Sequence, residues 1–329
     1  MQKIDISAKT IIFTIFLLIF LKFLWLIKDL LFSLLIAFIL MSALRPQVKL
    51  LENRRIPHSI AVFIVYFLFL LFFVLLFSIM LPPIIIETGN LIKSLPFIID
   101  SLNIRLSPWI QLESVTRYLP DVTNQLFKVA TGFLSNAFFI LSTLFFGFYF
   151  LLEGDAVRNM VTKYLDEPTG KKISNILEAA ESRMSSWFWG QLTLMFVVGL
   201  MSFIGLSLLG IKYVIPLAVL AGLLEVVPNI GPIISAVPAV LLGMSSSYIM
   251  GFSVAALYLI VQQLENNLIV PMIMRRAVGL NPIITLAVLV IGGRFGGILG
   301  VLLAIPAFLF IETIILELIK DRKVAEKAR

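Results

Sequence analysis

The sequence predicts an all-α, polytopic membrane protein with about eight hydrophobic segments, including two broken, re-entrant helical hairpins. Of its 329 residues, 60% are hydrophobic and 14% are charged, whereas soluble domains carry about 25% charged residues. The mean hydropathy is +1.05. Apolar runs of about 20 residues recur, long enough to span a hydrocarbon core about 30 Å thick, and no alternating ten-residue pattern indicates a β-barrel. We therefore expect a multi-pass helical bundle in the lipid bilayer.

The charged and reactive residues exclude several classes of function. The net charge is +7, but the basic residues lie in short loops and at the C-terminus among acidic ones, which indicates membrane topology and not nucleic-acid binding. Cysteine is absent and His58 is the single histidine, so thiol catalysis, Cys-bound zinc and an intramembrane Ser–His pair are excluded. No H-E-x-x-H motif or phosphate-binding loop occurs, and the central runs contain no Asp. We expect no enzyme, no catalytic residue, no metal and no cofactor.

The charges between the apolar runs predict their orientation. The runs fall at about 10–27, 30–44, 58–81, 129–152, 188–210, 213–245, 248–273 and 282–319. The densest basic loop, with Arg45, Lys49, Arg54 and Arg55, is expected in the cytoplasm under the positive-inside rule. Basic residues also place the N-terminus and the charged tail, 320–329, in the cytoplasm. Residues 1–81 should therefore form N-terminal transmembrane helices, the first two as a tight hairpin.

The next three segments are expected to alternate between the two sides of the membrane. Residues 82–128 carry four basic and four acidic residues and no long apolar run, which predicts an external insert of amphipathic helices. Residues 129–152 form a transmembrane helix that returns inside. Residues 153–187 form a cytoplasmic or interfacial helix, because one face is apolar. That face contains Ile173, Ile176, Leu177, Ala180, Met184 and Trp187.

Residues 188–319 are expected to form the core transport region. The run at 188–210 ends outside and the Arg275–Arg276 pair lies inside, so the run at 248–273 supplies the one crossing needed between them. The intervening run at 213–245 must therefore enter and leave the membrane on the same side. The same reasoning makes 282–319 a second hairpin, because basic residues predicted to be cytoplasmic flank both of its ends.

Proline and glycine mark the tips of these two hairpins. In the first, E-V-V-P-N-I-G-P separates halves of about 13 residues, each worth about 20 Å of helix. Pro228 removes a backbone donor and Gly231 allows a turn there. In the second, G-G-R-F-G-G interrupts the run beside Arg294. Paired broken segments of opposite orientation are how transporters build a substrate or ion site near the midplane.

Glu225 and Arg294 are rare charges at membrane depth, which makes them candidate binding residues. Glu225 can bind and release a proton or sodium ion if it lacks a partner. Alternatively, Glu225 and Arg294 form a structural ion pair between the two tips. The break at Pro228, Asn229 and Gly231 exposes backbone groups that either line a wet cavity or merely bend a packed helix. The sequence leaves both pairs of alternatives open.

A cluster of amides and one carboxylate lies in the run at 248–273. The stretch Q-Q-L-E-N-N supplies Gln262, Gln263, Glu265, Asn266 and Asn267. Because these residues cover more than one helix face, we expect a polar path or a network that joins helices. Their position before Arg275 places them in the cytoplasmic half of the membrane.

Several motifs resemble those of the autoinducer-2 exporter family of permeases. They are E-x-x-P-N-I-G-P, Q-Q-x-E-N-N-x-x-x-P, R-x-A-V-G-L-N-P and G-G-x-F-G-G-I-L-G-x-L-L-A-I-P, within residues 225–306. The W-G-Q sequence at Trp189 to Gln191 is also similar. The resemblance implies about eight hydrophobic segments in a protein that is often a homo-oligomer. Some members export the quorum-sensing furanone, and others are similar to sodium(lithium)/proton antiporters. Asn281 departs from the histidine common at its position, which argues against a titrating role there.

These observations predict a secondary transporter of the inner membrane. It exports a small polar solute such as autoinducer-2, or is coupled to protons or sodium. A sodium(lithium)/proton antiporter is the alternative, and a channel-like pore or membrane scaffold is a further one.

Overall fold

The chain folds into helices over the whole of its described length. The computed structural model describes residues 8–106, 136–154, 163–228, 230–274 and 281–327. Within these ranges no strand occurs, which confirms the all-α prediction. The helices, in chain order, are α1 (Ala8–Leu26), α2 (Lys28–Glu52), α3 (His58–Leu106), α5 (Ala137–Leu152), α7 (Glu167–Leu208), α8 (Val214–Leu224), α9 (Ile230–Ser246), α10 (Tyr248–Leu264), the π-helix η1 (Glu265–Ile269), α11 (Val270–Ile273) and α12 (Pro282–Lys327).

Five stretches are long and apolar enough to cross a membrane. They are Lys28–Glu52, His58–Met80, Glu167–Leu208, Tyr248–Ile273 and Ile283–Ile319. Shorter apolar helices occur at Ile11–Leu26, Ala137–Leu152, Val214–Leu224 and Ile230–Ser246. The chain is therefore a polytopic helical membrane protein, as its composition predicted.

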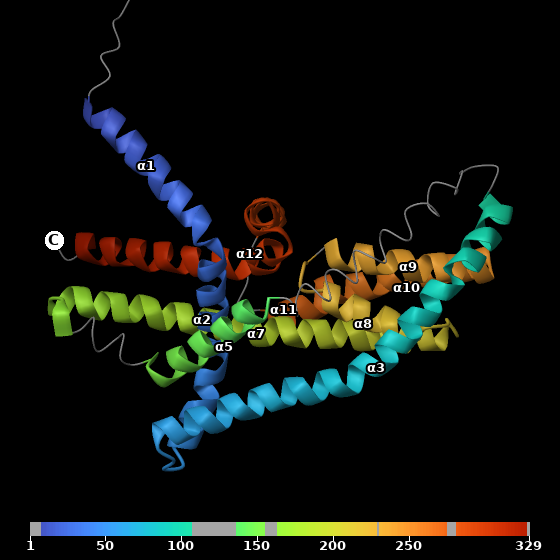
Figure 1. The fold of residues 1–329 in the computed structure, drawn as a ribbon, viewed down its shortest axis with the longest axis horizontal. Coiled ribbons are helices and arrows are strands. Elements are labelled where there is room, and N and C mark those ends of the chain that lie inside the picture. Colours follow the sequence, from blue (N-terminus) through green and yellow to red (C-terminus); the bar gives the residue numbers. More distant parts are fainter. Residues whose placement is uncertain (1–7, 107–135, 155–162, 229, 275–280, 328–329) are drawn as a thin grey trace, which may run out of the picture.

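Helices α1 and α2 do not form the tight hairpin expected from the sequence. The N–H of Ile27 donates to the carbonyl of Phe23, and the N–H of Leu31 donates to the carbonyl of Ile27, so the helical hydrogen bonds continue across the junction. Figure 1 shows α2 continuing from α1 with a bend and without a reversal of direction. The prediction of a hairpin was wrong because no Gly or Pro breaks the helix where Lys28 and Asp29 interrupt the apolar run.

Two long helices continue through boundaries at which the sequence suggested a change of segment. Helix α3 runs past residue 82 to Leu106, so the first half of the predicted external insert extends a membrane helix. The rest of that insert lies outside the described residues. Helix α7 joins most of the predicted interfacial helix to the following run and is about 63 Å long at 1.5 Å per residue. Its N-terminus is capped by Asp166, whose side chain accepts from the N–H of Thr169.

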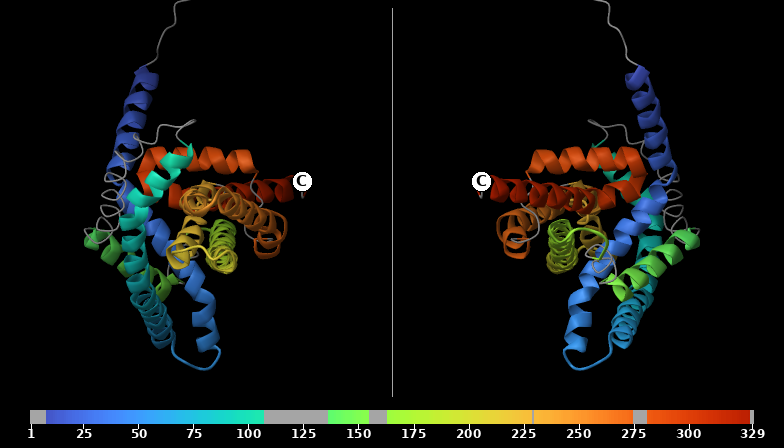
Figure 2. Two further views of the ribbon diagram at one scale, coloured as in Figure 1. Left: turned by 90° about the vertical axis from the view of Figure 1, so that its right-hand side faces the viewer. Right: turned by 90° about the vertical axis from the view of Figure 1, so that its left-hand side faces the viewer.

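Helices α7 to α10 lie side by side (Figures 1 and 2). Helix α12 packs along α7, and α3 packs against α8 and α9. Three apolar clusters hold the helices together. The first joins α2, α7 and α12, the second joins α7 to α10, and the third joins α2, α3 and α5. Ala180, Met184 and Trp187, from the predicted apolar face, are buried, and the last two belong to the first cluster. The amphipathic part of α7 therefore packs on the bundle.

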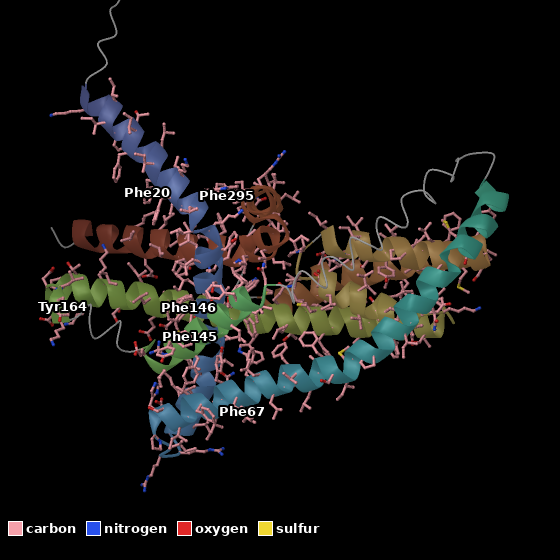
Figure 3. All side chains as sticks on the ribbon, viewed as in Figure 1. Phe20, Phe67, Phe145, Phe146, Tyr164 and Phe295 are labelled. Carbon is pink, nitrogen blue, oxygen red and sulfur yellow. The ribbon has the colours of Figure 1, made fainter. Side chains whose placement is uncertain are left out.

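Both predicted hairpins are present. Helices α8 and α9 pack against each other across a short turn. Helix α12 reverses at Gly297, whose φ of 58° and ψ of −135° favour glycine. The two halves of α12 touch at Gly292, before the bend, and Gly300, after it. An added Cβ on Gly300 would lie 1.9 Å from the Gly292 carbonyl oxygen. Figure 3 shows Phe295 near this bend, close to α1, and the rings of Trp25 and Phe295 are 6.0 Å apart.

Candidate functional site

The turn between α8 and α9 is a tightly packed break in the helical backbone. The N–H of Val227 donates to the Leu224 carbonyl at 3.0 Å, and the N–H of Gly231 donates to the Val227 carbonyl at 2.9 Å. A Cβ on Gly231 would lie 1.9 Å from the Leu224 carbonyl oxygen, so only glycine fits. Pro228 is partly buried in the turn, and Asn229 lies outside the described residues. The sequence-predicted tip is therefore real, and its glycine is required by close backbone packing.

Glu225 is buried directly before this turn and faces another carboxyl group. Its exposed fraction is 1%, and that of Glu265 is 3%. The two side chains lie within hydrogen-bonding reach of each other. Such a bond requires a proton on one of them, because an ionised carboxylate only accepts. Among the described residues, Oε2 of Glu225 has no hydrogen-bond partner.

A glutamine on α7 fixes the end of α8 beside this pair. Gln191 is 5% exposed, and its Nε2 donates to the backbone carbonyl of Glu225 at 2.9 Å. The last carbonyls of a helix have no partner within the helix, so this bond satisfies a buried acceptor. The close packing of α7 on α8 allows it, because a Cβ on Gly222 would lie only 2.7 Å from the Met195 carbonyl oxygen.

Glu265 reaches the pair from a π-helix. The N–H of Val270 donates to the carbonyl of Glu265, five residues earlier. Pro271 has no N–H for the usual bond to the Asn267 carbonyl, which favours the wider turn. Nε2 of Gln262 donates to Oε2 of Glu265 at 3.3 Å. Single π turns are frequent at functional sites, and this one begins at Glu265, which is buried in the bundle.

The remaining amides of the Q-Q-L-E-N-N stretch point elsewhere. Three side chains are exposed on the surface of the single chain, those of Gln263, Asn266 and Asn267. Nδ2 of Asn267 donates to Oε1 of Gln263 at 3.0 Å. The stretch therefore covers two faces, as expected. Gln262 and Glu265 face the bundle, and the other three residues face its surface.

Arg294 does not pair with Glu225. Its side chain is exposed at the α12 bend, and no ion pair between the two residues is found among the described residues. Of the two interpretations of Glu225, the structural ion pair with Arg294 is therefore not observed. Arg275 and Arg276 lie outside the described residues.

Two ion pairs connect α7 to its neighbours away from the carboxyl pair. Nη1 of Arg45 on α2 lies 2.6 Å from Oε2 of Glu181. Arg183 pairs with Glu312 on α12 and also donates to Oγ1 of Thr313 at 3.1 Å. Glu312, another rare carboxylate of the last apolar run, thus has a structural partner. No cluster of three or more potential metal ligands occurs in the part of the chain that the structure describes.

Sequence reasoning missed Gln191 and the partnership of the two carboxyl groups. Gln191 is the only polar side chain between Trp189 and Thr193, so the W-G-Q sequence alone could have marked it as a candidate. Glu225 and Glu265 were each singled out, but like charges are not expected to be neighbours in an apolar interior. Their contact could be found only from the way in which α8, α10 and η1 are arranged around α7 and α9.

This arrangement defines a multi-pass helical membrane protein of the transporter class, with broken helices around a buried polar centre. The chain belongs to the family described as AI-2E family transporter, which it matches over residues 12–320. "Putative transport protein YueF" of Bacillus subtilis is 26% identical over 333 residues, covering 94% of this chain and 90% of the relative. "Putative transport protein YhhT" of Escherichia coli K12 is 26% identical over 299 residues, 84% and 82% of the two chains. "Putative permease PerM" of the same organism is 27% identical over 189 residues, 56% and 52%.

Proposed function

We propose that this chain is a secondary transporter of the inner membrane in which Glu225 and Glu265 bind the coupling ion, a proton or sodium. The observation that carries the proposal is the contact between these two buried carboxyl groups. Two negatively charged carboxylates in contact in a poorly polarisable interior repel each other strongly. One proton or one monovalent cation between them removes the repulsion. The two ions therefore compete for one position, which is the requirement for exchange.

The broken helices support this proposal. Irregular backbone at membrane depth is tolerated where it is buried in protein or lines a wet cavity. Pro228 and Gly231 keep α8 and α9 apart as two short helices, and Pro271 favours the π turn under Glu265. Two interruptions thus meet at the carboxyl pair, as they do in transporters with discontinuous helices.

The transported solute is proposed to be small, polar and uncharged, with autoinducer-2 as the candidate that the family suggests. The exposed amides of Gln263, Asn266 and Asn267 and the guanidinium of Arg294 are candidate contacts for it. Polar groups at membrane depth need a polar neighbour, and we propose that a second copy of this chain covers them in a homo-oligomer. The charge pattern supports a cytoplasmic C-terminus, whereas the continuous α1–α2 helix no longer supports the same side for the N-terminus.

The test is flux in proteoliposomes under an imposed proton or sodium gradient. We expect Glu225→Gln and Glu265→Gln each to reduce gradient-driven flux by roughly ten-fold or more, equivalent to about 1.4 kcal/mol of ion-binding free energy. Glu178→Gln, which changes an exposed carboxylate on α7, is the matched control and should leave flux unchanged.

The outcomes separate the candidate functions. Full coupled flux in both site variants would refute the carboxyl-pair site. Sodium–proton exchange without any solute would assign the antiporter, and passive flux of many solutes without gradient dependence would assign a channel-like pore.

A further inference from the structure

Tyr258 carries a second buried oxygen atom without a partner. Its side chain is 8% exposed, and its Oη has no hydrogen-bond partner among the described residues. A buried hydroxyl that makes no hydrogen bond is unfavourable, and phenylalanine would fill the same space without that penalty. Packing alone therefore does not account for a tyrosine at this position.

Tyr258 lies on the same face of its helix as Glu265. Positions 251, 254, 258, 261 and 265 are all buried, and their alternating spacing of three and four marks the face of α10 and η1 that packs on the bundle. Tyr258 and Glu265 are seven residues apart, which is about two turns and about 10 Å along the axis. Gln262, which donates to Glu265, lies between them.

Helix α8 passes the same two levels in the same order, first the level of Tyr258 and then that of the carboxyl pair. Tyr258 belongs to an apolar cluster with Leu217 and Ala221 of α8. Ala221 precedes Glu225 by one helical turn and lies on the same face of α8. Helices α8 and α10 therefore run in the same direction from the level of Tyr258 to the level of the carboxyl pair. Position 258 therefore lies between the level of that pair and the ends at which α8 and α10 begin.

We propose that the Tyr258 hydroxyl is a second binding site for the ion that occupies the Glu225–Glu265 pair, on its route from the side where α8 and α10 begin. This inference rests on the proposed function. A neutral hydroxyl offers lone pairs to sodium or to a protonated water, and it donates a hydrogen bond to water that accompanies either ion. It binds the ion more weakly than two carboxyl groups do, which suits a site that the ion must also leave.

Tyr66 provides a matched control. It is buried to a similar degree, at 6% exposed, but its Oη donates to the Leu144 carbonyl at 2.6 Å. Removing the Tyr66 hydroxyl breaks a bond that stabilises the contact between α3 and α5. Removing the Tyr258 hydroxyl breaks no bond to a described residue. The two Tyr→Phe substitutions should therefore affect stability and flux in opposite ways.

The experiment compares Tyr258→Phe and Tyr66→Phe in the full-length protein, by thermal unfolding in detergent and by flux driven by a sodium or a proton gradient. We expect Tyr258→Phe to unfold at the wild-type temperature or above it and to transport roughly five-fold more slowly, the effect of losing one neutral hydrogen bond to the ion or its water. The half-saturating sodium concentration should rise where sodium is the coupling ion. Tyr66→Phe should unfold earlier and keep its flux per folded molecule.

The results distinguish this inference from the function on which it rests. Wild-type flux in Tyr258→Phe, together with reduced flux in Glu225→Gln, would overturn the second binding site and leave the carboxyl-pair site standing. A loss of flux that only parallels a loss of thermal stability would also overturn it. Wild-type flux in both glutamate variants would instead refute the proposed function.

Discussion

Gly231→Ala is the most direct test of the hairpin between α8 and α9. The added Cβ would lie 1.9 Å from the Leu224 carbonyl oxygen, about 1 Å closer than the 3.0 Å below which real Cβ contacts essentially do not occur. The atom it meets belongs to the backbone, so no side chain can rotate away. The start of α9 must move relative to the end of α8, or the turn must open.

The size of the effect follows from the rigidity of that contact. Overpacking a well-packed interior destabilises a protein by about 1–3 kcal/mol, and a clash with backbone belongs at the upper end of that range. We expect a fall of roughly 3–4 °C in the melting temperature in detergent, because the unfolding entropy of a chain of this length is large. Because Glu225 is six residues from Gly231, the displacement also disturbs its contact with Glu265. Coupled flux per folded molecule should fall as well.

Gly89→Ala is the control for this substitution. Gly89 lies within α3, and a Cβ there would meet nothing within 4 Å. Alanine favours a helix over glycine by about 0.5–1 kcal/mol, so this variant should melt at the same or a slightly higher temperature. If Gly231→Ala behaves like Gly89→Ala in both melting and flux, the tight turn does not exist and the geometry of the carboxyl pair is refuted with it.

Two further predictions concern the π turn and an ion pair. Pro271→Ala restores an N–H that can bond to the Asn267 carbonyl, so η1 should shorten to an α-helix, rotate the following residues against α10 and disturb the contact of Glu265 with Glu225. We expect unchanged or higher thermal stability with reduced coupled flux, and wild-type flux would contradict a role for the π turn. Arg183→Met and Glu312→Gln should each destabilise the protein. Their double-mutant cycle should give a coupling energy of about 1 kcal/mol, because the pair is partly buried. Additive effects of the two substitutions would show that the contact contributes nothing.

The backbone breaks could be predicted from the sequence because they follow from covalent chemistry. Proline lacks a donor and glycine tolerates conformations closed to other residues, whatever surrounds them. Hence Pro228 and Gly231 marked the first turn, and G-G-R-F-G-G marked the second, where Gly297 adopts its positive φ. The α1–α2 junction failed for the complementary reason. The hairpin there was predicted from the basic residues on either side of the two runs, and neither Lys28 nor Asp29 at the junction prevents a helix.

The partner of Glu225 could not be predicted, because it depends on the rotation of one helix against another. Sequence reasoning offered Arg294 as one possible partner of Glu225, with ion binding as the alternative, since opposite charges attract and both residues lie near hairpin tips. The π turn adds one residue to the helical turn, which rotates one part of the helix against the other by about 100°. Which of the polar residues in Q-Q-L-E-N-N face the bundle therefore depends on where that extra residue falls, and no pattern of polarity specifies it.

The electrostatics of the site favour a cation as the coupling species. Helix α8 ends at Leu224, and the C-terminal end of a helix carries a partial negative charge from its unpaired carbonyls. Glu225 and Glu265 lie at that end, but α9 begins beside it at Ile230, and its N-terminal partial positive charge offsets the dipole of α8, so the carboxyl groups decide the sign of the site. Gln191 offsets only part of this charge, because it bonds one carbonyl oxygen. A proton or sodium ion is stabilised by the two carboxyl groups, whereas an anionic solute is repelled by them. We therefore infer that the solute is neutral and binds to the amides beyond the pair, while the cation alone occupies the carboxyl groups.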